Sequence, residues 1–345
     1  MSIVIVGGGA IGLQVAGRLA LAGGEPSALL ARPSGVAALA EQPLTIRFPD
    51  GSVQQARVAA AASPAALPPT CRTPDLAVLC VKGYDTPGAI ETLRELGPRR
   101  VLTLQNGIGN EERLAAAFGP AQVIAGAITT SVEAPGPTEV VITKLGGVGL
   151  APLDPATGLS RWAAAFVAAG FPTRIYADPR ALKWSKALLN MLGNAQAAIL
   201  DMGVEEIYAD HRLLDLDLRA VREALAVMAR MGARPVNLPG YPAGTLATAS
   251  RLIPPFALRP LMRRLVGRGR GGKDPSLLRD LRAGRTRSEG EFLYGAVAAE
   301  AAARGVPAPV NAALWRTLDG IARRVIPWDE FRKRPDRLLA EVSAG

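Results

Sequence analysis

The feature that most constrains this chain is a glycine-rich loop between an apolar segment and a helical one. Residues 3–6 are Ile-Val-Ile-Val, the composition of a short buried strand, and the Ala- and Leu-rich residues up to about Ala22 favour a helix. Between them lies Gly7-Gly8-Gly9-Ala10-Ile11-Gly12. The pattern G-x-G-x-x-G is informative in this context, with a strand before it and a helix after it. A chain that starts this way is expected to build an α/β sheet.

Each glycine of the loop has an expected physical role. Gly7 permits the tight turn, Gly9 lets the backbone approach a pyrophosphate, and Gly12 lets the helix pack close to the sheet. The phosphates would lie at the helix N-terminus, where unpaired N–H groups and the helix dipole favour negative charge. The loop therefore predicts a dinucleotide site at Gly7, Gly8, Gly9, Ala10, Ile11 and Gly12. The alternative is a glycine-rich turn that binds nothing.

The end of the second expected strand indicates which dinucleotide is bound. The apolar residues 28–31 are followed by Arg32, about 20 residues beyond the last glycine of the loop, where an NAD enzyme has an acidic residue for the ribose 2′-hydroxyl. No carboxylate occurs between Arg32 and Glu41. Because a cation at this position pairs with a 2′-phosphate, the sequence favours NADP. The alternative is a surface arginine without a role.

The rest of the chain changes character once. Residues 76–81, 101–105, 123–130 and 140–143 have strand composition, and the helical patterns at 86–96, 110–118 and 159–169 lie between or after them. This alternation predicts a doubly wound sheet. From about residue 177 the pattern is helical throughout. We therefore expect an α/β protein with an N-terminal Rossmann-type doubly wound sheet in residues 1–176 and an all-helical C-terminal domain in residues 177–345.

Two expected strand ends and one helix carry polar residues that could form a site. The strand ends are Val81-Lys82-Gly83-Tyr84 and residues 104–109, Leu-Gln-Asn-Gly-Ile-Gly, and either could be no more than a turn. The helix would begin at Pro179, with Asp178 as N-cap, and reach about Leu200. One face of this helix carries a polar stripe, formed by Lys183, Lys186, Asn190 and Asn194. The stripe is either the solvated face of the helix or a set of residues selected for hydrogen-bonding geometry.

Composition excludes several kinds of chemistry. Two cysteines, Cys71 and Cys80, cannot form a disulfide framework or a Cys-rich zinc site, and Cys80 is expected in the core. The one histidine, His211, is expected on a helix surface. A Ser-His-Asp triad and most catalytic metal sites are thereby excluded, so no metal is expected. No apolar run reaches the roughly 18 residues that span a bilayer, and a cytoplasmic protein without a membrane partner is expected.

The positive charge of the chain is local. Residues 259–287 contain 10 Arg or Lys and two Asp, a balance of +8 within the net +10 of the whole chain. The rest is near neutral, so a general nucleic-acid surface is not expected. The segment at residues 259–273 also lacks aromatic residues for base stacking. It is either a solvated linker or an attractor for anionic ligands.

Taken together, these motifs resemble ketopantoate reductase, also called 2-dehydropantoate 2-reductase. The similarity covers nearly the whole chain and several segments occur in the family's order: the glycine loop, Val81-Lys82, residues 105–109, 183–190, 276–289, 292–297 and 305–311. The resemblance implies a Rossmann domain and a helical domain with the active site in the cleft between them. It implies NADP as cofactor and a small 2-oxo acid as substrate, and a homodimer is one assembly it would allow.

The resemblance also assigns roles to individual residues. It implies that Lys186 and Glu289 are catalytic, Lys186 as proton donor to the substrate carbonyl oxygen and Glu289 near the cofactor and the substrate hydroxyl. It implies that the substrate is bound by Asn106, Asn190, Asn194 and Ser276. It implies that the cofactor is bound, beyond the glycine loop, by Arg32, Lys82, Asn106 and Glu289.

The sequence departs from the family pattern in the late acidic motif. The family has Thr-Glu-Ile-Asp before an Asn-Gly, whereas this chain has Ser288-Glu289-Gly290-Glu291 and Tyr294 replaces the asparagine. One residue is added before Glu289, so Glu291 is an alternative for the acidic role. An asparagine expected shortly after the lysine helix is also missing, with Val204 nearest its position.

The chemistry of a carbonyl reduction agrees with a lysine donor. The donor must lie within hydrogen-bond reach of the carbonyl oxygen. A histidine donor is improbable with one histidine, and none of the five tyrosines has a lysine four residues on. Three functions remain: reduction of 2-dehydropantoate, reduction of another 2-oxo or β-hydroxy acid on the same scaffold, and a non-catalytic NADP-binding regulator.

Overall fold

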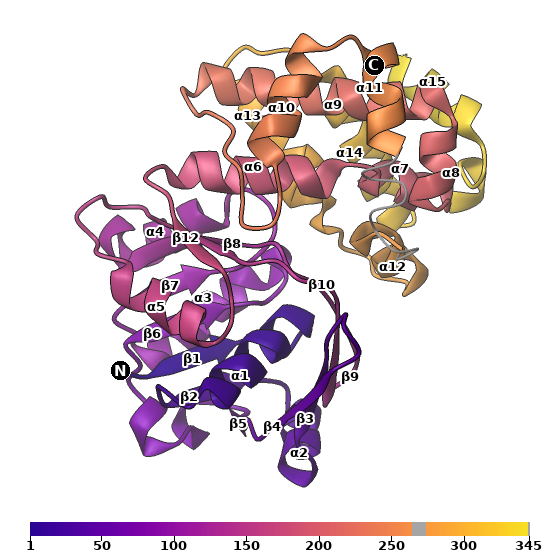
Figure 1. Cartoon of the computed structure of the whole chain (residues 1–345). Helices are drawn as coiled ribbons and strands as arrows, with labels where there is room; N and C mark the ends of the chain where they lie inside the picture. The colour runs from indigo at the N-terminus through magenta and orange to yellow at the C-terminus, as the bar shows by residue number, and fades with distance from the viewer. Residues whose placement is uncertain (264–273, 344–345) are drawn as a thin grey trace. The chain divides into compact units, whose positions relative to one another are not determined.

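The computed structural model describes residues 1–263 and 274–343 (Figure 1). The chain divides into two compact units. The N-terminal unit comprises Met1–Lys183 and Leu238–Tyr241, and the C-terminal unit comprises Trp184–Asn237 and Pro242–Gly345. The two interpretations of the basic segment, a solvated linker or an attractor for anionic ligands, concern residues 264–273 above all, and these lie outside the described part of the chain.

The N-terminal unit contains an eight-stranded sheet in the order β12-β11-β8-β7-β6-β1-β2-β5. Its strands are β1 Ile3–Val6, β2 Ser27–Leu30, β5 Ala59–Ala61, β6 Leu76–Leu79, β7 Val101–Thr103, β8 Val123–Ile128, β11 Val148–Pro152 and β12 Thr173–Ile175. Neighbouring strands are parallel except β11 and β8, which are antiparallel. Strand β1 is central, with β6 on one side and β2 on the other. The prediction of a doubly wound sheet is confirmed.

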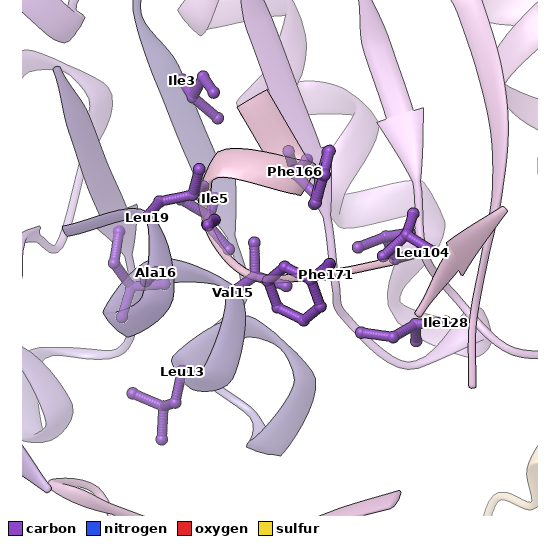
Figure 2. Packing of buried hydrophobic residues seen from close by; sticks show 14 of the residues in the cluster. Ile3, Ile5, Leu13, Val15, Ala16, Leu19, Leu104, Ile128, Phe166 and Phe171 are labelled. Atoms are coloured by element: carbon purple, nitrogen blue, oxygen red, sulfur yellow. The ribbon is translucent and has the colours of Figure 1, made fainter. Parts of the chain in front are cut away.

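Helices cover both faces of this sheet. Alternate residues of β1 face opposite sides: Ile3 and Ile5 pack in one buried cluster, Val4 and Val6 in another. The first cluster includes residues of α1 (Ala10–Ala22) and α5 (Ser160–Ala168), and Figure 2 shows Leu13 and Phe166 among them. The second includes residues of α3 (Thr86–Leu96) and α4 (Asn110–Phe118). Burial on both faces explains why these strands are continuous apolar runs.

A second, four-stranded sheet was not expected. Its order is β4-β3-β10-β9, with bounds Val53–Ala56, Leu44–Arg47, Glu139–Lys144 and Ser131–Gly136. The prediction that residues 140–143 belong to the doubly wound sheet is therefore wrong. Within β10, Val140 and Ile142 are buried whereas Thr143 is exposed. This alternation is typical of a sheet with one covered face, and α1 covers it closely, since a Cβ on Gly17 would lie 2.7 Å from the Leu44 side chain.

The described part of the C-terminal unit is helical, as predicted. Its helices are α6 Pro179–Met191, which begins in the N-terminal unit, and α7 Asn194–Leu200, α8 Val204–Ala209, α9 His211–Arg230, α10 Ala243–Leu252, α11 Pro255–Met262, α12 Ser276–Arg282, α13 Tyr294–Ala303, α14 Pro309–Ala322 and α15 Pro335–Ser343. Within the described ranges, no helix combines the length and apolarity needed to cross a membrane.

The single helix expected from Pro179 to about Leu200 is in fact two. Helix α6 ends at Met191, and α7 begins at Asn194 after Gly193, whose φ of +63° is left-handed. Such a break leaves buried N–H and C=O groups that need partners. The Gly193 N–H donates to Asp217, and the buried Tyr294 hydroxyl donates to the Met191 carbonyl. The same hydroxyl accepts a hydrogen bond from the Ala195 N–H at 3.1 Å.

The chain returns briefly to the N-terminal unit after α9. Leu238 and Tyr241 exchange two backbone hydrogen bonds of 2.9 Å, which close a tight turn. The Thr129 hydroxyl, just beyond β8, donates to the Pro239 carbonyl at 2.6 Å. The Tyr241 ring also lies 4.6 Å from the Lys144 ammonium. These four residues are thus packed on the N-terminal unit although their neighbours in sequence belong to the other.

Candidate active site

The glycine loop lies between β1 and α1 and has the geometry of a phosphate cradle. Gly7 has a φ of +113°, and a Cβ on Gly12 would lie only 1.8 Å from the Gly7 carbonyl oxygen. Both residues must therefore be glycine for the loop to close. Gly9 is different, because a Cβ there would have no heavy atom within 4 Å. Gly9 is also the N-cap of α1, whose first turn has no side-chain cap and no acidic residue. The open space and the unpaired N–H groups suit a bound pyrophosphate.

Arg32 follows the strand next to this loop. It is the exposed N-cap residue of α2 (Pro33–Glu41), two positions after the end of β2. A Cβ on Gly8 would lie 2.9 Å from the Cβ of Ala31, so the loop and the end of β2 are in close contact. A guanidinium beside the cradle suits a dinucleotide with a 2′-phosphate. The residues present therefore fit NADP.

The structure brings the two other candidate strand ends together. Lys82 and Asn106 follow β6 and β7, which are neighbours in the sheet, and both side chains are half-buried. The Gln105 side chain donates to the Lys82 carbonyl at 3.4 Å, so the two segments are joined directly. Gly107 and Gly109 have positive φ angles, which means that a turn alone accounts for those glycines. The polar residues beside them are not explained by the turn.

Lys183 contradicts the interpretation of the α6 stripe as a wet face. Its side chain is 4% exposed, and its ammonium lies 2.8 Å from the Glu111 carboxylate. Burial raises the pKa of the Glu111 carboxyl, and the Lys183 ammonium opposes that rise. Sequence reasoning missed this pair. The available signal was weak: a second lysine three residues before Lys186, which a solvated helix face would explain equally well.

In the C-terminal unit, three of the expected substrate residues meet at the break between α6 and α7. Asn194, the first residue of α7, donates to the Asn190 carbonyl at 2.9 Å and to the Ser276 hydroxyl at 3.5 Å. Its side-chain oxygen accepts from the Leu277 N–H at 3.2 Å. Lys186 precedes Asn190 by four residues on α6, so both lie on the same helix face, and both are half-buried. The Asn194 amide thus ties the end of α6 to the start of α12.

The late acidic motif forms a short 3₁₀ helix, η6, at Glu289–Phe292. The Ser288 hydroxyl caps it by accepting from the Gly290 N–H at 3.1 Å. Glu289 is 6% exposed and Glu291 is half-buried. Tyr294, where the family has asparagine, is the residue whose hydroxyl satisfies the backbone at the α6–α7 break. This substitution therefore has a structural role that the sequence did not reveal.

The remaining reactive side chains lie apart from this chemistry. His211 is exposed at the first turn of α9, as predicted. Cys80 follows β6 and packs against the core, and burial raises the pKa of its thiol. Among the described residues, no three His, Cys, Asp or Glu side chains are grouped closely enough to hold a metal ion.

Comparisons with known proteins find matches along most of the chain. The family model "Ketopantoate reductase PanE/ApbA" matches residues 3–155, and the corresponding C-terminal model matches residues 178–322. A 2-dehydropantoate 2-reductase of Halobacterium salinarum is 30% identical over 94% of this chain and 98% of its own. One of Pyrococcus abyssi is 28% identical over 93% and 97%.

Solved structures show the same fold. A PanE/ApbA family ketopantoate reductase from Ralstonia eutropha has a TM-score of 0.77 and 26% identity, covering 94% of this chain and 99% of that one. D-mandelate dehydrogenase with NADH and anilino(oxo)acetate has a TM-score of 0.78 at 19% identity over the same shares. At that identity the second similarity concerns the fold alone.

Proposed function

Because the chain belongs to the ketopantoate reductase family, we propose that it catalyses the NADPH-dependent reduction of 2-dehydropantoate to pantoate, a step in pantothenate and coenzyme A synthesis. The observation that carries the proposal is the cradle at the carboxyl edge of the main sheet. There Gly9 leaves the helix N-terminus open, and Arg32 follows the neighbouring strand. This is the arrangement that an oxidoreductase using a phosphorylated dinucleotide requires.

The cofactor contacts are assigned along this edge. The glycine loop binds the pyrophosphate, Arg32 pairs with the 2′-phosphate, and Lys82 and Asn106 bind further along the edge. When bound, NADPH supplies the hydride. The hydrogen bond between Gln105 and the Lys82 carbonyl supports this assignment, because it fixes both segments before any ligand binds. Preorganised donors lose less free energy to ordering on binding.

Lys186 is the proposed proton donor. Its ammonium gives a proton to the substrate carbonyl oxygen and stabilises the negative charge that develops there. Asn190, Asn194 and Ser276 hold the substrate. The 3.5 Å bond from Asn194 to Ser276 is long enough to be exchanged for a substrate oxygen, whereas the shorter bond to the Asn190 carbonyl keeps the amide oriented.

Glu289 is assigned the acidic role beside the cofactor and the substrate hydroxyl. Its near-complete burial in η6 supports Glu289 over the more exposed Glu291. A buried carboxylate interacts more strongly with neighbouring groups than a solvated one. Comparison of Glu289→Gln with Glu291→Gln separates the two, and the substitution that costs more turnover identifies the acidic residue.

The second candidate is the same reaction on another 2-oxo acid or on a β-hydroxy acid. Tyr294 in place of the family asparagine, just after the late acidic motif, favours keeping it. A non-catalytic NADP-binding regulator is the third. We further propose a cytoplasmic enzyme whose partner is a small 2-oxo acid, with the homodimer as its assembly and no nucleic-acid partner.

The decisive experiment follows NADPH oxidation by absorbance across a panel of 2-oxo acids that includes ketopantoate. Highest kcat/KM with ketopantoate supports the proposal, a different best substrate supports the second candidate, and no turnover supports the regulator. Lys186→Ala should lower kcat about 100- to 10,000-fold because a positioned acid is lost. Lys333→Ala, at an exposed lysine just before α15, is the control and should leave kcat unchanged.

A further inference from the structure

A buried lysine precedes the proposed proton donor by one helical turn and has no part in the proposed mechanism. The Lys183 ammonium donates to the Gln105 carbonyl at 2.7 Å and to the Gly126 carbonyl at 3.2 Å, and it pairs with Glu111 at 2.8 Å. These contacts match the three hydrogens of an ammonium group. Both partners of the ion pair are buried, with 4% and 6% exposed. A charge is costly to bury, so its partners fix its position closely.

The main contact of Lys183 is with the peptide group that leads into Asn106. The Gln105 carbonyl oxygen and the Asn106 N–H belong to one planar peptide unit. An ammonium that holds this oxygen at 2.7 Å therefore also fixes the direction of the Asn106 N–H and the start of its side chain. Glu111 holds the ammonium from the first turn of α4, the helix that comes after this loop.

The Gln105 side chain extends the constraint to the neighbouring strand end. Its Nε2 donates to the Thr86 hydroxyl at 2.9 Å and to the Lys82 carbonyl at 3.4 Å. Its oxygen accepts from the Thr103 hydroxyl at 3.0 Å. Gln105 is thus held through both its backbone and its side chain, and it is 3% exposed.

Asn110 closes the network from the other side. Its side-chain oxygen accepts from the Thr86 hydroxyl at 3.2 Å, and its Nδ2 donates to the Asn106 carbonyl at 3.2 Å. Asn110 and Thr86 are fully buried. Asn106 is consequently fixed at the peptide before it by Lys183 and at its own carbonyl by Asn110. Networks of this kind hold a site rigid only while every member has its partner.

We propose that Lys183 is a positioning residue for hydride transfer, which it serves by fixing the Gln105–Asn106 peptide at the carboxyl edge of the sheet. Lys186 comes three residues later on α6, where Cβ atoms of such neighbours are about 5–6 Å apart. One turn of α6 therefore carries both lysines: Lys186, the proton donor, and Lys183, which orients the segment at Asn106. The proposal rests on the proposed function, because Asn106 is there assigned to the cofactor and the substrate.

The test compares two substitutions of buried cations. Lys183→Met keeps most of the alkyl chain and removes the ammonium. Arg18→Met is the matched control, because Arg18 is also buried and also donates to backbone carbonyls of the N-terminal unit, those of Ala169 and Gly170. Arg18 lies in the second half of α1 and is no member of the network around Gln105. Both substitutions should lower thermal stability.

The measurement is a single turnover by stopped flow, with NADPH limiting and enzyme and ketopantoate in excess. Because active enzyme exceeds NADPH, the amplitude is set by the NADPH added, and the rate constant reports the chemistry in the active enzyme. The active fraction is counted separately, by titrating the NADPH-binding sites by fluorescence. Lys183→Met should lower the rate constant about 10- to 100-fold, the effect of a small misplacement of reacting groups. Arg18→Met should leave the rate constant unchanged. A Lys183→Met enzyme that loses NADPH-binding sites but keeps the wild-type rate constant overturns the proposal, since the lysine then only stabilises the fold.

A milder variant and a second measurement cover the other outcomes. If Lys183→Met does not fold, Glu111→Gln leaves the ammonium with its two carbonyl acceptors and should lower the rate constant in the same direction but less. If the wild type reduces no 2-oxo acid, the proposed function fails, and hydrogen exchange of the NADPH complex still tests the positioning. Amides of residues 105–110 should then exchange faster in Lys183→Met than in Arg18→Met, and equal exchange contradicts the proposal.

Discussion

The same methyl group should destabilise the fold at one glycine of the cradle and leave it intact at another, while NADPH binding suffers at both. A Cβ on Gly12 would lie 1.8 Å from the Gly7 oxygen, whereas real Cβ atoms essentially never come within 3.0 Å of another heavy atom. The loop or the helix must therefore shift by more than 1 Å in Gly12→Ala. Overpacking costs about 1–3 kcal/mol, and a clash with backbone this short belongs to the upper part of that range, about 2–3 kcal/mol. Alanine regains about 1 kcal/mol of helix propensity. We expect the free energy of unfolding to fall by roughly 1–2 kcal/mol, with NADPH binding lost because the loop is distorted.

Gly9→Ala should leave the fold of the apoprotein intact and weaken only the binding of NADPH. Gly9 has φ −82° and ψ −179°, which alanine adopts freely, and no atom lies within 4 Å of its added Cβ. The unfolding free energy should fall by no more than about 1 kcal/mol, the usual cost of alanine at an N-cap position. A pyrophosphate close to the Gly9 backbone would meet the methyl and lose charged hydrogen bonds, which are worth about 1.5–3 kcal/mol. NADPH should therefore bind about 10- to 100-fold more weakly.

The assays are urea denaturation of the apoprotein and titration of NADPH by its fluorescence. Gly88→Ala is the control, because Gly88 lies in α3 with open space around it and should gain about 1 kcal/mol of stability without a change in Kd. Wild-type NADPH affinity in Gly9→Ala would show that the phosphates lie elsewhere. Wild-type stability in Gly12→Ala would refute the packing argument.

Three other side chains allow further tests. Arg32→Asp should weaken NADPH binding by about 1.5–3 kcal/mol and affect NADH much less, and equal losses for both cofactors would remove the 2′-phosphate assignment. Tyr294→Phe should cost about 1–3 kcal/mol of unfolding free energy, measured with urea, because the buried Ala195 N–H loses its acceptor at the α6–α7 break. Burial raises the pKa of the Cys71 and Cys80 thiols, so both should react slowly with a disulfide reagent until guanidinium unfolds the chain, and rapid labelling of the native protein would contradict this burial.

The main sheet could be predicted because its strands carry their own signal. Ile3–Val6 and Leu76–Leu79 are apolar on both faces, and the glycine loop after Val6 indicates that a helix comes next. The second sheet could not be predicted in the same way. Its strand β3 is paired in parallel with β10, which lies far along the chain, and the exposed residues of β4, Val53 to Gln55, give no apolar run. Pairing over such a distance depends on the tertiary fold more than on local composition.

The candidate site likewise contains residues that the sequence could locate and contacts that depend on the tertiary fold. The glycine loop and Arg32 could be located because a strand–loop–helix pattern fixes their positions along the chain. The partners of Lys183 could not, because Glu111 and the Gln105 carbonyl lie more than 70 positions earlier in the chain and approach only when the sheet has formed. Gly193 interrupts a long helical pattern, but the sequence does not tell whether a helix glycine is tolerated or breaks the helix. In the structure Gly193 breaks the helix, because its φ is left-handed and the Tyr294 hydroxyl accepts a hydrogen bond from the Ala195 N–H at the break.

The short return of Leu238–Tyr241 to the N-terminal unit has a consequence for dissecting the gene. The polypeptide passes between the units at three places instead of one. Neither unit is therefore encoded by one continuous stretch of the gene. A fragment ending at Lys183 would lack the Pro239 carbonyl that accepts from Thr129 and the ring that lies over Lys144. Separate expression of the two halves should therefore yield a poorly folded first half. Attaching the four residues Leu238–Tyr241 to this fragment through a short linker should improve its folding, because it restores both contacts.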